Sequence, residues 1–181
     1  MSKIHIEILN LKKSFKHLSG SINLFNNLNI KIKEGELVAL VGPSGSGKSS
    51  LLHLLALLDE PTQGKIIINR IDTKRLKSNE KDELRRKNIS IIFQDNNLLT
   101  DFTAIENIKM PLIIKNENRE IISKKAEKIL KDVKIFDRSN HFPNQLSGGE
   151  QQRVAIARAL ISETNIILAD EPTGNLDHKT S

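Results

Sequence analysis

The residues best suited to chemistry lie in one stretch, Gly42-Pro43-Ser44-Gly45-Ser46-Gly47-Lys48-Ser49. The spacing Gly, four residues, Gly, Lys, Ser is the pattern of a phosphate-binding loop. Glycines let the backbone bring its N–H groups close to phosphate oxygens. The lysine can reach the β- and γ-phosphates, and the serine hydroxyl that follows it can ligate Mg²⁺. An ordinary Gly/Ser turn is the alternative, but the motif fixes four positions in eight and favours nucleotide binding.

The segments around this loop predict a strand, a turn and a helix. Residues 37–41 are apolar on both faces, which is typical of a buried central parallel strand. Residues 50–58 predict a largely buried helix, on which His53 is expected to be packed and hydrogen-bonded. The helix begins near Ser49 and Ser50, where unpaired first-turn N–H groups favour an anion.

A second motif is Leu146-Ser147-Gly148-Gly149-Glu150-Gln151-Gln152-Arg153. Ser147 and Glu150 form a capping box that predicts a helix running to about residue 160. Many helix starts have this pattern, so the box alone implies no function. The two glycines are unusual, because helix propensity disfavours them unless another group must approach the backbone closely.

Two carboxylates, Asp170 and Glu171, follow the apolar segment 166–169, which predicts a buried strand. The first can hold Mg²⁺ and the second can polarise an attacking water. A surface turn would be the simpler interpretation if no phosphate-binding loop preceded it. Another buried strand, residues 89–93, ends at Gln94.

Composition limits the alternatives. The 181 residues predict one domain with a substantial core, and they include no cysteine for disulfides or thiolate metal sites. No apolar run reaches the ~18–20 residues that span a bilayer. The net charge of +6 is dispersed and there is no Trp or Tyr, so we expect no nucleic-acid binding.

The remaining pattern predicts the other elements. Alternating residues 4–8 and 28–32 predict two antiparallel strands, and residues 65–68 a third. Thr103 is expected to cap a helix that Pro111 interrupts, and an apolar stripe over residues 121–133 predicts an amphipathic helix. The spacing does not decide the role of Phe15. It could be an ordinary aromatic residue at the edge of the core, or its ring could stack on an adenine base.

Together, these motifs resemble the ATP-binding cassette (ABC) ATPases along the whole chain. The resemblance implies an α/β phosphate-loop NTPase fold with a mixed β-sheet core, an N-terminal antiparallel β subdomain and an inserted helical subdomain. It implies ATP and Mg²⁺ as cofactors, with Ser49, Gln94 and Asp170 near the metal. It implies catalytic roles for Lys48, Gln94 and Glu171. The implied nucleotide contacts are Phe15, Gly42, Pro43, Ser44, Gly45, Ser46, Gly47, Lys48, Ser49, Ser50, Ser147, Gly148, Gly149, Gln151 and Asp177.

The same resemblance implies one domain over residues 1–181. Residues 1–94 and 161–181 would form the nucleotide-binding core, and residues 95–160 the helical subdomain. A second copy would pair head to tail, so that its Ser147 and glycines face the γ-phosphate. Integral membrane subunits would dock near residues 94–107, which places the chain peripherally on the cytoplasmic face of the inner membrane.

Residues 51–55 and 97–112 look like those of the lipoprotein-releasing ATPases. Macrolide-exporter and cell-division ATPases share much of this sequence and remain alternatives. Another alternative is a nucleotide-binding remnant without turnover, since family members continue to a switch histidine that no histidine here matches. We therefore expect the family's C-terminal part to be missing, leaving residues 37–41 and 166–169 beside a gap.

Overall fold

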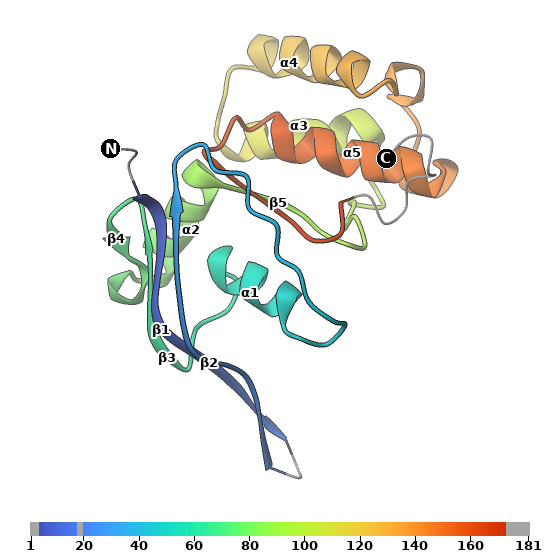
Figure 1. The fold of residues 1–181 in the computed structure, drawn as a ribbon. Helices are drawn as coiled ribbons and strands as arrows, with labels where there is room; N and C mark the ends of the chain where they lie inside the picture. The colour runs from blue at the N-terminus through green and yellow to red at the C-terminus, as the bar shows by residue number, and fades with distance from the viewer. Residues whose placement is uncertain (1–3, 18–19, 173–181) are drawn as a thin grey trace. The chain divides into compact units, whose positions relative to one another are not determined.

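The computed structural model describes residues 4–17 and 20–172, which belong to two compact units. The first unit ends at Arg85 and the second begins at Arg86. Figure 1 shows a long β-ribbon in the first unit and a group of helices in the second. Each unit carries part of the predicted chemistry, so each is described in turn.

The first unit is built on a four-stranded antiparallel sheet in the order β2-β1-β3-β4. The strands are β1 (Ile4–His17), β2 (Gly20–Lys33), β3 (Gln63–Ile68) and β4 (Ile71–Asp72). Ile6 lies opposite Ile68, and Ile8 opposite Ile66, and all four side chains are buried. The predicted antiparallel pairing is confirmed, and the strands are longer than the alternating pattern indicated.

Helix α1 (Lys48–Leu55) packs into this unit through Leu51, Leu54 and Leu55. The short 3₁₀ helix η1 (Thr73–Arg75) and helix α2 (Ser78–Asn88) follow the sheet. His53 is exposed, so the prediction that it is packed was wrong. The reason is that α1 is buried over a narrower arc than its apolar sequence indicated, and position 53 falls outside that arc.

Residues 37–41 do not form the predicted buried strand. They carry no strand assignment, and Leu37 is 101% exposed and Val41 89% exposed. A parallel strand is buried only when hydrogen-bonded neighbours and covering helices flank it. No strand in the described part of the chain pairs with these residues. Apolar sequence was therefore insufficient to make the element.

In its described residues, the second unit combines a parallel pair of strands with three helices that lie wholly within it. The strands are β5 (Ile89–Ile92) and β6 (Ile166–Ala169), and the helices are α3 (Ala104–Ile114), α4 (Arg119–Asp132) and α5 (Gly148–Leu160). Two 3₁₀ turns, η2 (Phe136–Arg138) and η3 (Pro143–Gln145), precede α5. A buried cluster that includes Ile108, Leu130 and Val154 joins the helices, which Figure 1 shows grouped together.

Two helix predictions differ in outcome. Thr103 is the N-cap of α3, as predicted, and its N–H donates to Glu106 Oε2 at 2.8 Å, a bond that the sequence analysis did not predict. Pro111 lies inside α3 and does not interrupt it, because the buried Ile108 and Leu112 hold the helix on both sides of the proline. In α4 only part of the predicted stripe is buried, namely Ile122, Ala126 and Leu130.

Candidate functional site

The phosphate-binding loop forms a tight turn that leads directly into α1. Gly45 and Gly47 have φ values of 78° and 94°, a region that L side chains rarely adopt. The Ser46 N–H donates to the Pro43 carbonyl at 3.3 Å, and the Leu51 N–H to the Gly47 carbonyl at 2.9 Å. Lys48 Nζ donates to the carbonyls of Gly42 and Pro43 at 2.9 and 3.0 Å. The loop thus curls around its own lysine at the N-terminal end of a helix.

Ser49 and Ser50 lie in the first turn of α1, half-buried, while Ser44 is exposed in the turn. A helix N-terminus presents N–H groups without intrahelical partners and the positive end of the helix dipole. The geometry of residues 42–50 therefore suits an anionic group with several oxygens.

Sequence reasoning missed an aromatic neighbour of this loop, Phe25 on β2. A Cβ built on Gly47 would lie 2.9 Å from Phe25 Cζ, so the ring packs directly against the glycine. Any side chain at position 47 would displace the ring and would also strain a backbone with positive φ. The available signal was weak, since one apolar residue in an alternating strand is usual.

Phe15 lies on β1, opposite Ile22 of β2, with its side chain 42% exposed. Lys13 Nζ lies 4.7 Å from the centroid of the Phe15 ring. An exposed aromatic with a cation against it is unlike an ordinary core residue. Its predicted contact with adenine remains a prediction.

In the second unit, the ends of β5 and β6 bring Gln94 and Glu171 together. Gln94 Nε2 donates to Glu171 Oε2 at 3.2 Å, although the two residues are 77 positions apart. The Asp170 N–H donates to the Ile92 carbonyl at 2.9 Å and so continues the pairing of the strands. The parallel register explains why Gln94 and Glu171 lie together. Ile92 of β5 pairs with Ala169 of β6, so the two strands end at the same edge of the sheet.

Glu171 has a φ of 48°, in the left-handed region that is uncommon for a residue with a side chain. Such backbone strain clusters at functional sites. The buried Gln152 of α5 donates from Nε2 to the Pro172 carbonyl at 2.9 Å, which fixes the turn that follows Glu171.

Ser147 caps α5 in the predicted box. Its Oγ accepts the Glu150 N–H at 3.3 Å, and its N–H donates to Glu150 Oε2 at 2.8 Å. The Ser147 N–H bond is the main reason that the pKa of Glu150 lies below its usual range, and Arg138, at 3.1 Å, contributes to the lowering. A Cβ on Gly148 would meet no atom of the described residues within 4 Å, so no contact among residues 4–17 and 20–172 requires glycine there.

Gln151, predicted to contact nucleotide, donates from Nε2 to the carbonyls of Pro143 and Leu146 at 2.9 and 3.2 Å. These bonds tie the start of α5 to the preceding turn. Gly149 is half-buried in the first turn of α5, and Asp177 lies outside the described residues.

Residues 25–174 match the sequence profile of the family described as ABC transporter. The chain belongs to this family. It is 46% identical to an uncharacterized ABC transporter ATP-binding protein, MJ1508, of Methanocaldococcus jannaschii, over 97% of this chain and 78% of that protein. It is 43% identical to the lipoprotein-releasing system ATP-binding protein LolD of Hyphomonas neptunium, over 97% of this chain and 77% of that protein.

Solved structures of the cassette MJ0796 agree with this assignment. A dimeric post-hydrolysis state bound to ADP and Pi matches with a TM-score of 0.92 and 45% identity, over 97% of this chain and 77% of that one. A second dimeric structure of MJ0796 matches with a TM-score of 0.92 and 46% identity over the same shares. The chain is thus the ATP-binding subunit of an ABC transporter and an ATPase, and the expected fold class is confirmed.

The donors of this ABC ATPase fit a magnesium ion better than a softer metal. Over residues 4–17 and 20–172, no group of three or more His, Cys, Asp or Glu could hold a metal. Mg²⁺ takes one or two carboxylates and completes its shell with water and substrate phosphates. Ser49 in the first unit, and Gln94 and Asp170 in the second, each carry an oxygen donor of the kind that Mg²⁺ takes.

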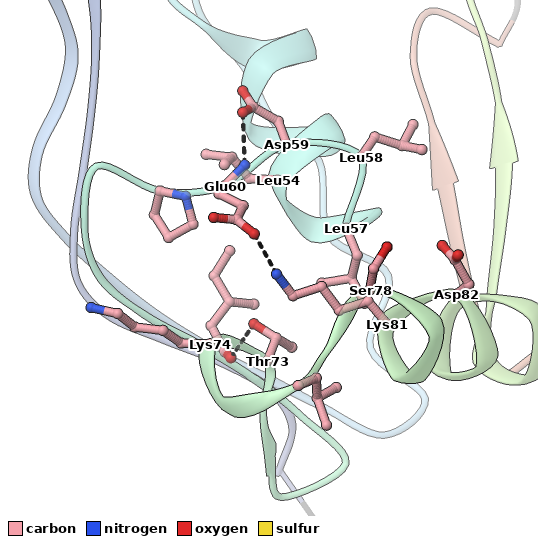
Figure 2. A pocket seen from close by; sticks show the side chains of 13 residues that line it. Leu54, Leu57, Leu58, Asp59, Glu60, Thr73, Lys74, Ser78, Lys81 and Asp82 are labelled. Atoms are coloured by element: carbon pink, nitrogen blue, oxygen red, sulfur yellow. Dashed lines mark hydrogen bonds and ion pairs between the residues drawn. The ribbon is translucent and has the colours of Figure 1, made fainter.

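A separate pocket of about 410 Å³ lies in the first unit, between the end of α1, residues 59–61, η1 and the start of α2. Figure 2 shows the ion pair of Glu60 with Lys81 in this pocket and the bond from Thr73 to a backbone carbonyl. None of residues 42–50 lines the pocket, so it is distinct from the phosphate-binding loop.

Among the described helices, none is both long and apolar enough to cross a bilayer.

Proposed function

We propose that this subunit binds ATP through residues 42–50, hydrolyses it with Glu171, and powers the release of lipoproteins from the inner membrane. The proposal rests mainly on the phosphate-binding loop. Its Gly45 and Gly47 have left-handed backbone conformations, and the loop leads into α1 with the Lys48 side chain bonded to its own carbonyls. Lys48 would leave the carbonyls of Gly42 and Pro43 to reach the β- and γ-phosphates. The loop N–H groups would then hold phosphate oxygens.

The hydrolytic role of Glu171 rests on its placement at the end of β6 beside Gln94. A carboxylate at this position would accept a proton from, or orient, the attacking water. Gln94, 3.2 Å from it, would hold that carboxylate and contribute an oxygen near the metal. Bound Mg²⁺ would neutralise charge on the phosphates, with Ser49 and Asp170 among its holders.

The signature segment supports a head-to-tail pair of cassettes. Ser147 is exposed at the N-terminal end of α5, and its Gly148 neighbour is open to an approaching group. A helix N-terminus with a hydroxyl and accessible N–H groups favours a phosphate. Within this proposal, Ser147, Gly148 and Gly149 meet the γ-phosphate on a second copy, whereas Gln151 holds the helix start in place.

The domain layout and the membrane partners are part of the same proposal. Residues 95–160 would act as the helical subdomain, and membrane subunits would dock at residues 94–107. In that range, Leu99 and Phe102 are exposed large apolar residues, 42% and 39% respectively. The likeness to LolD supports lipoprotein release as the transport reaction, with the subunit bound peripherally to the inner membrane.

Two measurements test the proposal. Lys48→Ala should weaken MgATP binding at least tenfold in calorimetric titration, because a charged partner of the phosphates is lost. The exposed Lys65→Ala in β3 is the matched control and should bind as the wild type does. Equal affinity of both variants would remove Lys48 from the site.

The transport reaction is tested in proteoliposomes that contain the membrane subunits encoded by neighbouring genes. ATP should release a lipid-anchored protein from these vesicles to a soluble acceptor, and the Lys48→Ala subunit should not support release. ATP hydrolysis without release would contradict the lipoprotein substrate while leaving the ATPase function standing.

A further inference from the structure

Lys13 is a buried lysine that contacts three groups at once. Its Nζ donates to Asp59 Oδ1 at 2.7 Å and to the Glu60 carbonyl at 2.9 Å, and it lies 4.7 Å from the centroid of the Phe15 ring. The residue is only 7% exposed. Burying an ammonium group is costly unless its partners are well placed, so this arrangement constrains the surrounding chain.

Residues 59–62 fasten the strand that carries Phe15. The Thr62 N–H donates to the Lys12 carbonyl at 2.8 Å, and the Ser14 N–H donates to Thr62 Oγ1 at 3.0 Å. Lys13, between these two residues, adds the ion pair with Asp59. Three consecutive residues before Phe15 are thus held by one loop, which we call the 59–62 clamp.

The next glycine brings β3 close to the same part of β1. Gly64 has a φ of 90°, and a Cβ there would lie 2.4 Å from the Asn10 carbonyl oxygen. Since that contact is with backbone, no side chain could be accommodated without moving a strand. The clamp is therefore backed by close strand packing.

The clamp also connects directly to the helix that follows the phosphate-binding loop. α1 begins at Lys48 and ends at Leu55, so only residues 56–58 separate it from Asp59. Asp59 Oδ1 accepts the Glu60 N–H at 2.7 Å, a bond drawn in Figure 2 that holds the carboxylate in the turn. Phe15 and the phosphate-binding loop are consequently joined, within one unit, by α1 and the clamp.

We propose that Lys13 is a positioning residue for the nucleotide base: held by Asp59, it fixes the Phe15 ring at a set place relative to the phosphate-binding loop. This inference rests on the proposed function, in which Phe15 stacks on adenine. Lys13 and Phe15 are two residues apart on one strand and therefore share a face. The ammonium covers one part of the ring, and the exposed remainder is available to a base.

A ring that is held in place before binding loses less conformational freedom when the base arrives. The effect concerns the base alone, because within the described part of the chain the hydrogen bonds and the ion pair of Lys13 and Asp59 do not reach residues 42–49. ATP affinity should thus depend on Lys13, whereas the affinity for a ligand that has phosphates and no base should not.

The experiment compares MgATP with magnesium tripolyphosphate in calorimetric titrations of the 181-residue chain. Lys13→Met keeps an apolar stem and removes the charge; it should weaken ATP binding by about three- to tenfold. Tripolyphosphate binding should stay within about twofold, which also shows that the variant is folded. Lys31→Met is the matched control, because Lys31 pairs with Glu7 at 2.8 Å on the same sheet and lies over no aromatic ring of the described residues.

Two further variants separate positioning from a general effect on folding. Lys13→Arg should recover most of the ATP affinity, since a guanidinium can pair with Asp59 and cover the ring. In a Phe15→Ala background, Lys13→Met should cause no additional loss, because the ring through which it acts is absent.

The outcomes are distinct. If the wild type binds neither ligand, the proposed function fails and the inference fails with it. If the wild type binds both ligands and Lys13→Met leaves ATP affinity unchanged, the inference alone is overturned. Equal loss of both ligands in Lys13→Met, or an undiminished effect in the Phe15→Ala background, would also overturn it by showing a merely structural role.

Discussion

Arg158 on α5 fixes the segment that follows Gln94. Its Nη2 donates to the Asn96 carbonyl and its Nη1 to the Asn97 carbonyl, both at 2.7 Å. Asn96 and Asn97 have φ values of 60° and 44°, so two consecutive left-handed residues turn their carbonyls toward one guanidinium. We predict that Arg158→Met loosens this segment and with it the position of Gln94.

The magnitude follows from the two bonds. A hydrogen bond with a charged donor contributes ~1.5–3 kcal/mol, so the pair would contribute ~3–6 kcal/mol. These values already include the exchange of hydrogen bonds with water, and the lower end applies because Arg158 is only half-buried. We therefore expect the opening free energy of residues 94–99 to fall by ~3 kcal/mol, equivalent to roughly a hundredfold faster exchange.

Hydrogen–deuterium exchange of the amides of residues 94–99 measures this opening without assuming that both units unfold together. Arg153→Met is the matched control on the same helix, because Arg153 Nη1 donates to the Val133 carbonyl at 3.3 Å, a longer bond that does not involve residues 94–99. Its exchange in residues 94–99 should resemble that of the wild type. Similar exchange in the two variants would refute the reasoning.

Three other predictions concern the site. Glu171→Gln should keep ATP binding but lower turnover by ~10²–10⁴, the usual contribution of a general base, measured by phosphate release; undiminished turnover would remove Glu171 from catalysis. Ser147→Arg should abolish hydrolysis while sparing ATP binding, and mixing it with Lys48→Ala chains should restore activity through one intact composite site; a silent mixture would contradict action in trans. Glu150 has a pKa below its usual range because of the Ser147 N–H and Arg138, so its stabilisation is complete above about pH 5 and is lost as the pH falls through the folded-state pKa. Glu150→Gln keeps the capping box, and its thermal melts should show a weaker dependence on pH between 5 and 3; an unchanged dependence would contradict the assignment.

The local features were predictable from the sequence. The phosphate-binding loop, the Ser147 box on α5 and the Thr103 cap of α3 formed as expected. Each depends on residues within eight positions of one another, where backbone preference and capping bonds act without help from the rest of the chain. The antiparallel pairing of β1 with β2 was also predictable, because each segment alternates apolar and polar residues and the two segments are close in the sequence.

Tertiary structure decided the features that join distant residues. The 3.2 Å contact of Gln94 with Glu171 follows from the parallel register of β5 and β6, and the Lys13–Asp59 pair from the path of the chain after α1. Residues 37–41 also show that burial depends on tertiary structure. This apolar segment has no paired strand beside it in the described part of the chain and is exposed. Side-chain type states what a residue can bond to, but burial and pairing require a partner that only the folded chain brings within reach.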